Sequence, residues 1–196
     1  MLGAAALVAC GSSLTDPAQD LGEGRGNLTV LLTDAPFPFE LVSQANVSIS
    51  RVDIVSANEG ILTIAEGEQT FNLLDLQNGV TAVLAQANLS AGTYPQIRLI
   101  VSSASVVLND GATFDLFVPS GAQTGIKVLL PDFSVDAGGN VTLTLDFDVS
   151  ESFVVMGNPD TPAGIQGFIF KPVVRPLGLA DDDPDDPEDE EDDDNG

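Results

Sequence analysis

Apolar and polar residues alternate along much of the chain between residues 27 and 179, in short runs separated by turn-forming residues. In the clearest run, residues 141–149, every odd-numbered residue is apolar and every even-numbered residue is polar. Leu28, Val30 and Leu32 repeat the same spacing near the start of this region. Successive side chains of a strand point to opposite faces, so the pattern predicts strands with one face on a core and the other in water.

The sequence Asn-Asp-Gly at residues 109–111 predicts a β-hairpin. It follows the apolar run 106–108 and precedes a new alternation of Phe114, Leu116 and Val118. Such a turn allows the positive backbone angles that tight hairpin connections require.

A change of phase across Arg51 predicts a β-bulge or a change of sheet. The apolar positions before it are Val47 and Ile49, and those after it are Val52 and Ile54. A strand without an irregularity would keep the same parity throughout.

Five other segments have the composition of strands. Pro172 and Pro176 place the last of them at a sheet edge, because proline cannot donate a hydrogen bond within a central ladder. The segments are residues 61–65, 70–73, 96–102, 126–130 and 167–174.

One helix is expected among the strands. Asp75 can cap a segment whose apolar residues fall on one helical face, although Gly79 weakens this prediction. The apolar residues are Leu76, Val80, Val83 and Leu84.

Eight to ten short strands and one short helix favour an all-β fold. We expect an antiparallel β-sandwich, immunoglobulin-like or transthyretin-like, over residues 27–179, in preference to a barrel. A chain of 196 residues, 43% of them hydrophobic, supports one core of this size.

The charge of the chain excludes one class of partner. Six basic residues face thirty acidic ones, which gives a net charge of −24. Such a chain repels phosphate backbones, so no nucleic-acid partner is expected. Twelve of the acids lie in residues 181–194, and residues 180–196 are expected to form a disordered acidic tail because no apolar residue follows Ala180.

The N-terminal residues resemble the lipobox of bacterial lipoproteins. Residues 1–9 are small or apolar and end in Leu-Val-Ala directly before Cys10, which is followed by Gly-Ser-Ser. The resemblance implies a partial signal peptide over residues 1–9 and a lipid-modified Cys10, followed by a flexible tether over residues 10–26. It implies a location in the bacterial cell envelope, on the periplasmic or surface face of the outer membrane. The alternative is a cytosolic protein whose leader contains a cysteine by chance.

Composition also limits the possible chemistry. The chain has no histidine and a single cysteine, which excludes an internal disulfide and imidazole or multi-thiolate metal sites. Serine catalysis would need Lys127 or Lys171 as its base, and neither lies in a recognisable motif. Asp146 and Asp148 share one strand face roughly 7 Å apart, a separation found in glycosidases, but we expect that face to be solvated.

Three loops could supply oxygen ligands to calcium. None has the spacing of an EF-hand loop, and loop aspartates usually bond to the local backbone. The loops contain Asn109-Asp110-Gly111, Asp132 with Asp136, and Asn158 with Asp160.

Other polar residues are expected to have structural roles. Arg51 and Arg98 lie within apolar strands and should each pair with one of the surplus carboxylates. Four asparagines in Asn-x-Ser/Thr triplets are interpreted as turn residues that lead into strands. They are Asn27, Asn46, Asn88 and Asn140.

Four segments together are similar to one bacterial family, the domain of unknown function family 4382. Its members are exported, often as lipoproteins, and no activity is attached to them, so the resemblance implies a fold and a location only. In the most distinctive segment, residues 91–99, Gly92 turns the chain and Tyr94 can pack its ring while its hydroxyl reaches a polar edge. The other segments are residues 31–36, 47–52 and 71–76.

These observations favour a non-catalytic envelope lipoprotein that acts as a binding or structural module. Its partner would be an envelope protein or a carbohydrate, with protein favoured because the chain has no tryptophan and one tyrosine. No cofactor is expected. The alternatives are a hydrolase that uses carboxylates alone and a calcium-binding adhesion module.

Overall fold

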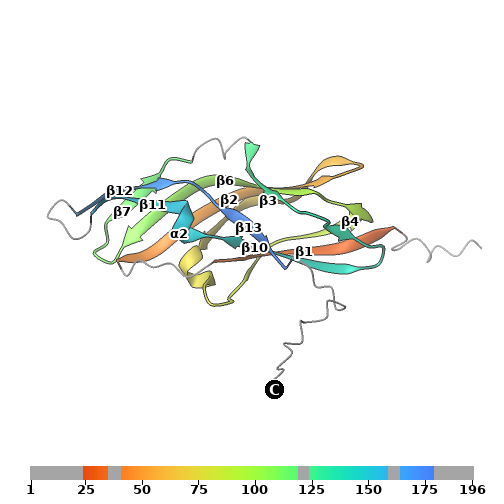
Figure 1. Ribbon diagram of the computed structural model, residues 1–196, viewed down its shortest axis with the longest axis horizontal. Helices are drawn as coiled ribbons and strands as arrows, with labels where there is room; N and C mark the ends of the chain where they lie inside the picture. The colour runs from red at the N-terminus through yellow and green to blue at the C-terminus, as the bar shows by residue number, and fades with distance from the viewer. Residues whose placement is uncertain (1–23, 35–40, 119–123, 159–163, 179–196) are drawn as a thin grey trace, which may run out of the picture.

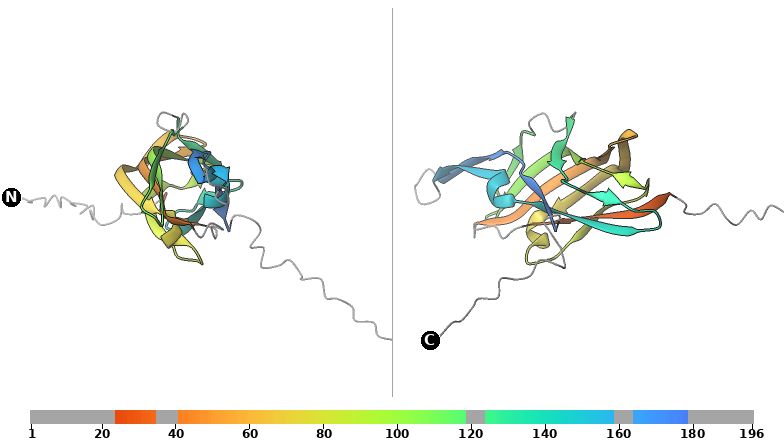
Figure 2. Two further views of the ribbon diagram at one scale, coloured as in Figure 1. Left: turned by 90° about the vertical axis from the view of Figure 1, so that its left-hand side faces the viewer. Right: turned by 45° about the vertical axis from the view of Figure 1, so that its right-hand side comes forward.

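The computed structural model describes residues 24–34, 41–118, 124–158 and 164–178. Two sheets lie face to face, and the end-on view in Figure 2 shows their strands around a common interior. The four-stranded sheet has the order β13-β10-β1-β4. Its strands are β1 (Arg25–Thr33), β4 (Ala82–Ser90), β10 (Asn140–Phe147) and β13 (Val174–Leu177).

The five-stranded sheet has the order β3-β2-β6-β7, and β8 also pairs with β6 (Figure 1). The register of β2 shifts next to Arg51 in its pairing with β3 and also in its pairing with β6. These shifts confirm the predicted bulge. The strands are β2 (Val42–Ser56), β3 (Gly60–Asn72), β6 (Gln96–Leu108), β7 (Thr113–Leu116) and β8 (Ile126–Leu129).

Two small ribbons and two single turns of helix complete the described fold. The ribbon β11–β12 lies at the end of the sandwich that also holds β7 (Figure 1). The elements are β5 (Gly92–Thr93), β9 (Ser134–Val135), β11 (Phe153–Asn158), β12 (Gly164–Phe170), the 3-10 turn η1 (Leu73–Leu76) and the helix α2 (Val149–Ser152). No helix in the described residues is long and apolar enough to cross a membrane.

One strand pair departs from the otherwise antiparallel arrangement of the described strands. β1 and β10 run parallel, with Leu28 opposite Val141 and Leu32 opposite Leu145. The carboxyl ends of parallel strands meet at the same edge of a sheet. Asp34, which follows β1, is therefore brought close to Asp148, which follows β10.

The residues that the alternation predicts to be buried lie in the core. Leu28, Val30 and Leu32 are buried, as are Leu143 and Leu145. The hairpin between β6 and β7 is also confirmed, with antiparallel pairing on both sides of the predicted turn. An aromatic group closes one end of the core, with ring centroids 6.3 Å apart for Phe147 and Phe170 and 5.1 Å apart for Phe153 and Phe170.

The helix predicted from Asp75 is wrong. Residues 73–76 form one 3-10 turn, and the chain then enters β4 at Ala82. Asn78 and Gly79 have φ angles of 59° and 82°, which end the helical path. Val83, expected on a buried helix face, is exposed on the strand. The α-helix of the described chain is α2, in a segment predicted to be the end of a strand.

Two other predicted boundaries were wrong. The segments 61–65 and 70–73 belong to one continuous strand, β3, because a positive-φ glycine, Gly67, lets the chain continue through a bulge. The predicted segment 167–174 ends at Phe170 as β12, and β13 begins only after Pro172. β13 is an edge strand, as Pro176 predicts.

Candidate functional site

Asp34 lies at the shared carboxyl end of β1 and β10 and is 4% exposed. Its Oδ1 accepts a hydrogen bond from the Val149 N–H at 3.0 Å, and its Oδ2 accepts one from Gln77 Nε2 at 3.3 Å. Burial raises the pKa of Asp34 to about 7, and the nearby Asp146 and Asp148 add to the effect. Asp34 is not among the site residues predicted from the sequence. Its signal was an acidic residue directly after an alternating strand.

Asp148 does not lie on a solvated strand face, which corrects the expectation for the Asp146 and Asp148 pair. The strand ends at Phe147, and Asp148 caps α2 by accepting from the Glu151 N–H at 3.0 Å. Its second oxygen accepts from Arg175 at 3.0 Å. Burial alone would raise the pKa of Asp148, but the bonds from Ser150, Glu151 and Arg175 outweigh it and lower this pKa.

These carboxylates serve the fold. The oxygens of Asp34 and Asp148 accept hydrogen bonds from backbone and side-chain donors that fix the corner between β10 and α2. Asp146 lies on the outer side of β10, half-buried, between two buried core positions. A retaining or inverting hydrolase needs two carboxyl groups on either side of a substrate. The arrangement here joins strand ends instead.

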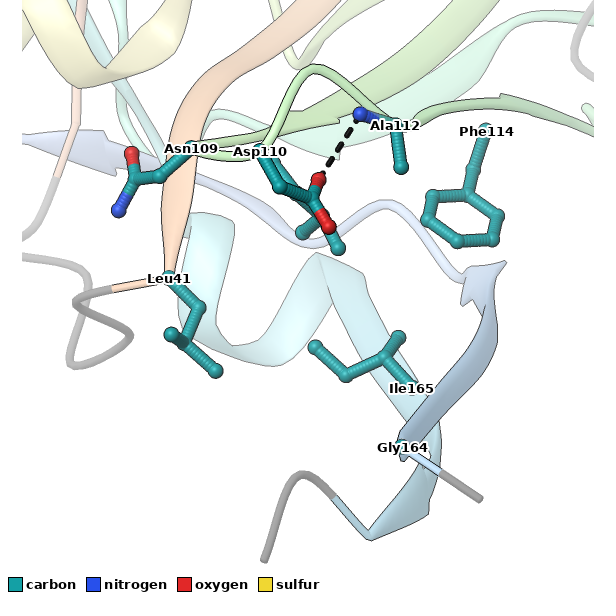
Figure 3. Close-up of a pocket in the computed structure, with 8 residues that line it drawn as sticks. Leu41, Asn109, Asp110, Ala112, Phe114, Gly164 and Ile165 are labelled. Atoms are coloured by element: carbon teal, nitrogen blue, oxygen red, sulfur yellow. Dashed lines mark hydrogen bonds between the residues drawn. The ribbon is translucent and has the colours of Figure 1, made fainter. Parts of the chain in front are cut away.

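A pocket of about 410 Å³ lies at the end of the sandwich where β2 begins and β6 turns into β7 (Figure 3). Its walls are mainly apolar, and the Asp110 carboxylate at its rim accepts a hydrogen bond from the Ala112 N–H at 2.9 Å. The volume lies in the range of small-ligand sites. The lining residues are Leu41, Leu108, Asn109, Asp110, Ala112, Phe114, Gly164 and Ile165.

The ribbon β11–β12, whose residue Ile165 lines the pocket, also has exposed apolar side chains on its outer face. Val154 and Ile169 are direct cross-strand partners, and Met156 lies opposite Gly167. These three apolar side chains are each more than 40% exposed. An apolar pocket beside an apolar ribbon is typical of a surface that binds a partner.

All four predicted turn asparagines are strand residues, although Asn140 is the first residue of β10 and so leads into its strand as predicted. Asn27, on β1, faces Asn140 on one side and Asn88 on the other. Asn27 donates to Asn140 and accepts from Asn88, with both distances 3.0 Å. Arg25 closes the row by bonding to Asn88. The fourth, Asn46, lies in β2.

The two strand arginines have different surroundings. Arg51 forms an ion pair with Asp53 at 3.1 Å, as predicted. Among the described residues, no carboxylate lies within ion-pair distance of Arg98, so its predicted pairing is not found there. The carboxylate opposite Arg98, that of Asp53, is already bonded to Arg51 and Thr63.

The proposed calcium loops do not converge in the described residues. No group of three or more acidic or cysteine side chains there is arranged to hold a metal ion. Asp110 bonds to its own turn, and Asp132 has a φ of 54° in a separate loop. Asp160 lies outside the described residues, as do Cys10, the predicted tether before Gly24 and the predicted acidic tail.

The fold is an all-β sandwich with its ionisable groups at strand ends and on outer faces. The family profile described as domain of unknown function (DUF4382) matches residues 25–172, which is most of the chain. The protein therefore belongs to this family, as the four sequence segments predicted. No curated protein and no solved structure matches it.

Proposed function

We propose that the protein is a non-catalytic binding module of the bacterial cell envelope, carried on a lipid anchor at Cys10. The observation that supports this most is the position of the pocket. β1 begins at one end of the sandwich, and β7, β11 and β12 gather at the other end (Figure 1). A tether joined to β1 would hold the pocket away from the membrane.

The chemistry of the pocket favours an apolar side chain of a partner protein as the bound group. Leu41, Leu108, Phe114 and Ile165 provide apolar contacts, and Asp110 offers an acceptor at the rim. Carbohydrate sites usually depend on exposed aromatic faces, whereas the single tyrosine of this chain, Tyr94, is buried, and the exposed Phe117 is not a lining residue of the pocket.

The roles of the carboxylates also support binding without catalysis. Asp34 and Asp148 hold strand ends together through hydrogen bonds that a substrate would have to displace. Neither Lys127 nor Lys171 is a lining residue of the pocket in Figure 3.

Photo-crosslinking in producing cells tests the pocket. A benzophenone amino acid placed at Ala112 should give a discrete crosslinked band with an envelope protein, because this residue lines the pocket. The control position is Thr142, an exposed residue on the outer face of β10. Ile165→Asp should abolish the band from position 112 by placing a charge in the apolar wall. The same band from both positions, or no band from position 112, would contradict the proposal.

Acyl labelling tests the anchor separately. Wild-type protein should incorporate a labelled fatty acid, and Cys10→Ala should not, because the thioether and the mature amino terminus both depend on that cysteine. Retention of the label in Cys10→Ala would overturn the anchoring part of the proposal and leave the pocket part standing.

A further inference from the structure

A row of polar side chains crosses the outer face of the five-stranded sheet. The strand registers place Thr63 opposite Asp53, Asp53 opposite Arg98, and Arg98 opposite Lys127. The neighbours of Arg98 on β6, Ile97 and Leu99, are fully buried in the core, so the row lies on the other side of the sheet.

Arg98 and Lys127 are adjacent cations with no ion-pair partner among the residues that the structure describes. Asp53, opposite Arg98, has its oxygens bonded to Arg51 and Thr63 and forms no ion pair with either cation. The Nε of Arg98 and the Nε2 of Gln96, two positions away on the same face, have no hydrogen-bond acceptor. These two atoms are buried, so an acidic ligand is favoured by the two adjacent cations and not by these donors.

The neighbouring surface is also open. Leu129 lies on β8 two residues beyond Lys127 and is 71% exposed. β8 is an edge strand of its sheet, so the cationic pair lies at the border of the face. A ligand can reach the pair from the side without crossing the rest of the sheet.

The chain itself supplies an acidic segment after a strand that contacts β8. β13 contacts β8, and the described residues end at Gly178, directly after β13. Asp181, the first of the twelve acids in residues 181–194, follows three residues later, which is about 10 Å of extended chain. A tethered segment this close has a high effective concentration at the face.

We infer that the acidic segment 181–194 docks on the outer face of the five-stranded sheet, over Arg98 and Lys127. The segment occupies the side of the face formed by β6 and β8, since Asp53 and Glu66 make the β2 and β3 side less favourable. An acidic partner that bound this face would have to displace the segment. The acidic tail is thus an internal competitor for a cationic pair on a strongly acidic protein.

Zero-length crosslinking tests the inference with the full chain. A carbodiimide joins a lysine amine to a carboxylate as an amide, and takes up the water that is lost. The chain has two lysines, Lys127 and Lys171, and the second is a built-in control because it is exposed and lies only seven residues before Gly178. Crosslinked peptides are quantified by mass spectrometry in dilute protein.

We expect peptides that join the tail to Lys127 in about tenfold excess over those that join it to Lys171. The excess should disappear in about 1 M salt, where the Debye length is only ~3 Å. Arg98→Gln should lower the yield at Lys127 alone, with an unchanged circular dichroism spectrum and Tm. Equal yields at the two lysines, an excess that survives salt, or crosslinks only between molecules would each overturn the inference. The last outcome would assign the tail to a second copy.

Discussion

The two sheets differ in how their charged side chains are paired. In the four-stranded sheet, Asp34 and Asp148 follow the carboxyl ends of the parallel strands β1 and β10, and Arg175 lies on β13. All three have hydrogen-bond or ion-pair partners. On the outer face of the five-stranded sheet, Arg98 and Lys127 have no ion-pair partner in the described part of the chain. Paired groups hold strands in place, whereas unpaired ones gain most from a ligand. The first region therefore holds strands together, and the second is the one where we propose that a ligand binds.

The largest expected change in stability is the pH dependence that Asp34 gives to the paired region. Asp34 has its pKa raised by burial from 3.8 to about 7, so between these values the folded chain holds a proton that the unfolded chain has lost. The free energy of unfolding of the wild type should therefore fall as the pH rises through this window, by on the order of 4 kcal/mol in total. Asp34→Asn keeps the shape and has no proton to lose, so its stability relative to wild type should rise across the window and level off above about pH 7.

Urea denaturation at several pH values measures this difference. Asp115→Asn, at an exposed position on β7, is the control substitution. A constant difference between Asp34→Asn and wild type at all pH values would show that the buried carboxyl is ionised in the folded state. In that case, the carboxyl would be held by its donors more strongly than burial opposes it.

The next effect tests how closely the four-stranded sheet is packed. A methyl group at Gly26 on β1 would lie 2.7 Å from Val135 Cγ1 and still closer to the carbonyl oxygen of Asp136. Gly26→Ala should thus cost about 3 kcal/mol, because backbone must move to relieve the contact. Gly139→Ala is the matched control, since its methyl group would lie 3.1 Å from the same Asp136 carbonyl. Equal losses in the two variants, measured by thermal unfolding, would mean that β9 adjusts freely over β1.

The sequence predicted which face of a strand is buried better than it predicted which strands pair with each other. Alternation identifies which side of β1 and β10 is buried, because burial follows from local parity. It contains nothing about which strands pair, so the parallel contact that brings Asp34 to α2 was not predictable. Leu76, Val80 and Val83 have helical spacing, but the left-handed conformation at Asn78 and Gly79 overrides it. The missing partner of Arg98 depends on Asp53 being already bonded, which only the three-dimensional arrangement shows.

A smaller loss of stability is expected at the turn in residues 91–99, the most distinctive segment of the sequence. The Tyr94 ring is buried, and its hydroxyl donates to the Ser90 carbonyl at 2.6 Å. Tyr94→Phe keeps the ring and removes this bond, which should cost about 1 kcal/mol. Chemical denaturation should show a lower midpoint with an unchanged slope. A loss near that of a core truncation, several kcal/mol, would instead indicate that the bond positions β4 as a whole.

The smallest effect compares one arginine from each region directly. Arg175→Gln removes bonds to Asp148 and Glu151, at 3.0 and 2.7 Å, and should lower the Tm. Arg98→Gln removes a cation that has no ion-pair partner in the described chain, so it should leave the Tm unchanged or raise it. Both changes remove one positive charge, so the general effect on a chain of net charge −24 cancels in the comparison. An equal fall in Tm for the two variants would mean that Arg98 stabilises the fold as strongly as the fully paired Arg175 does, and the distinction between the two faces would fail.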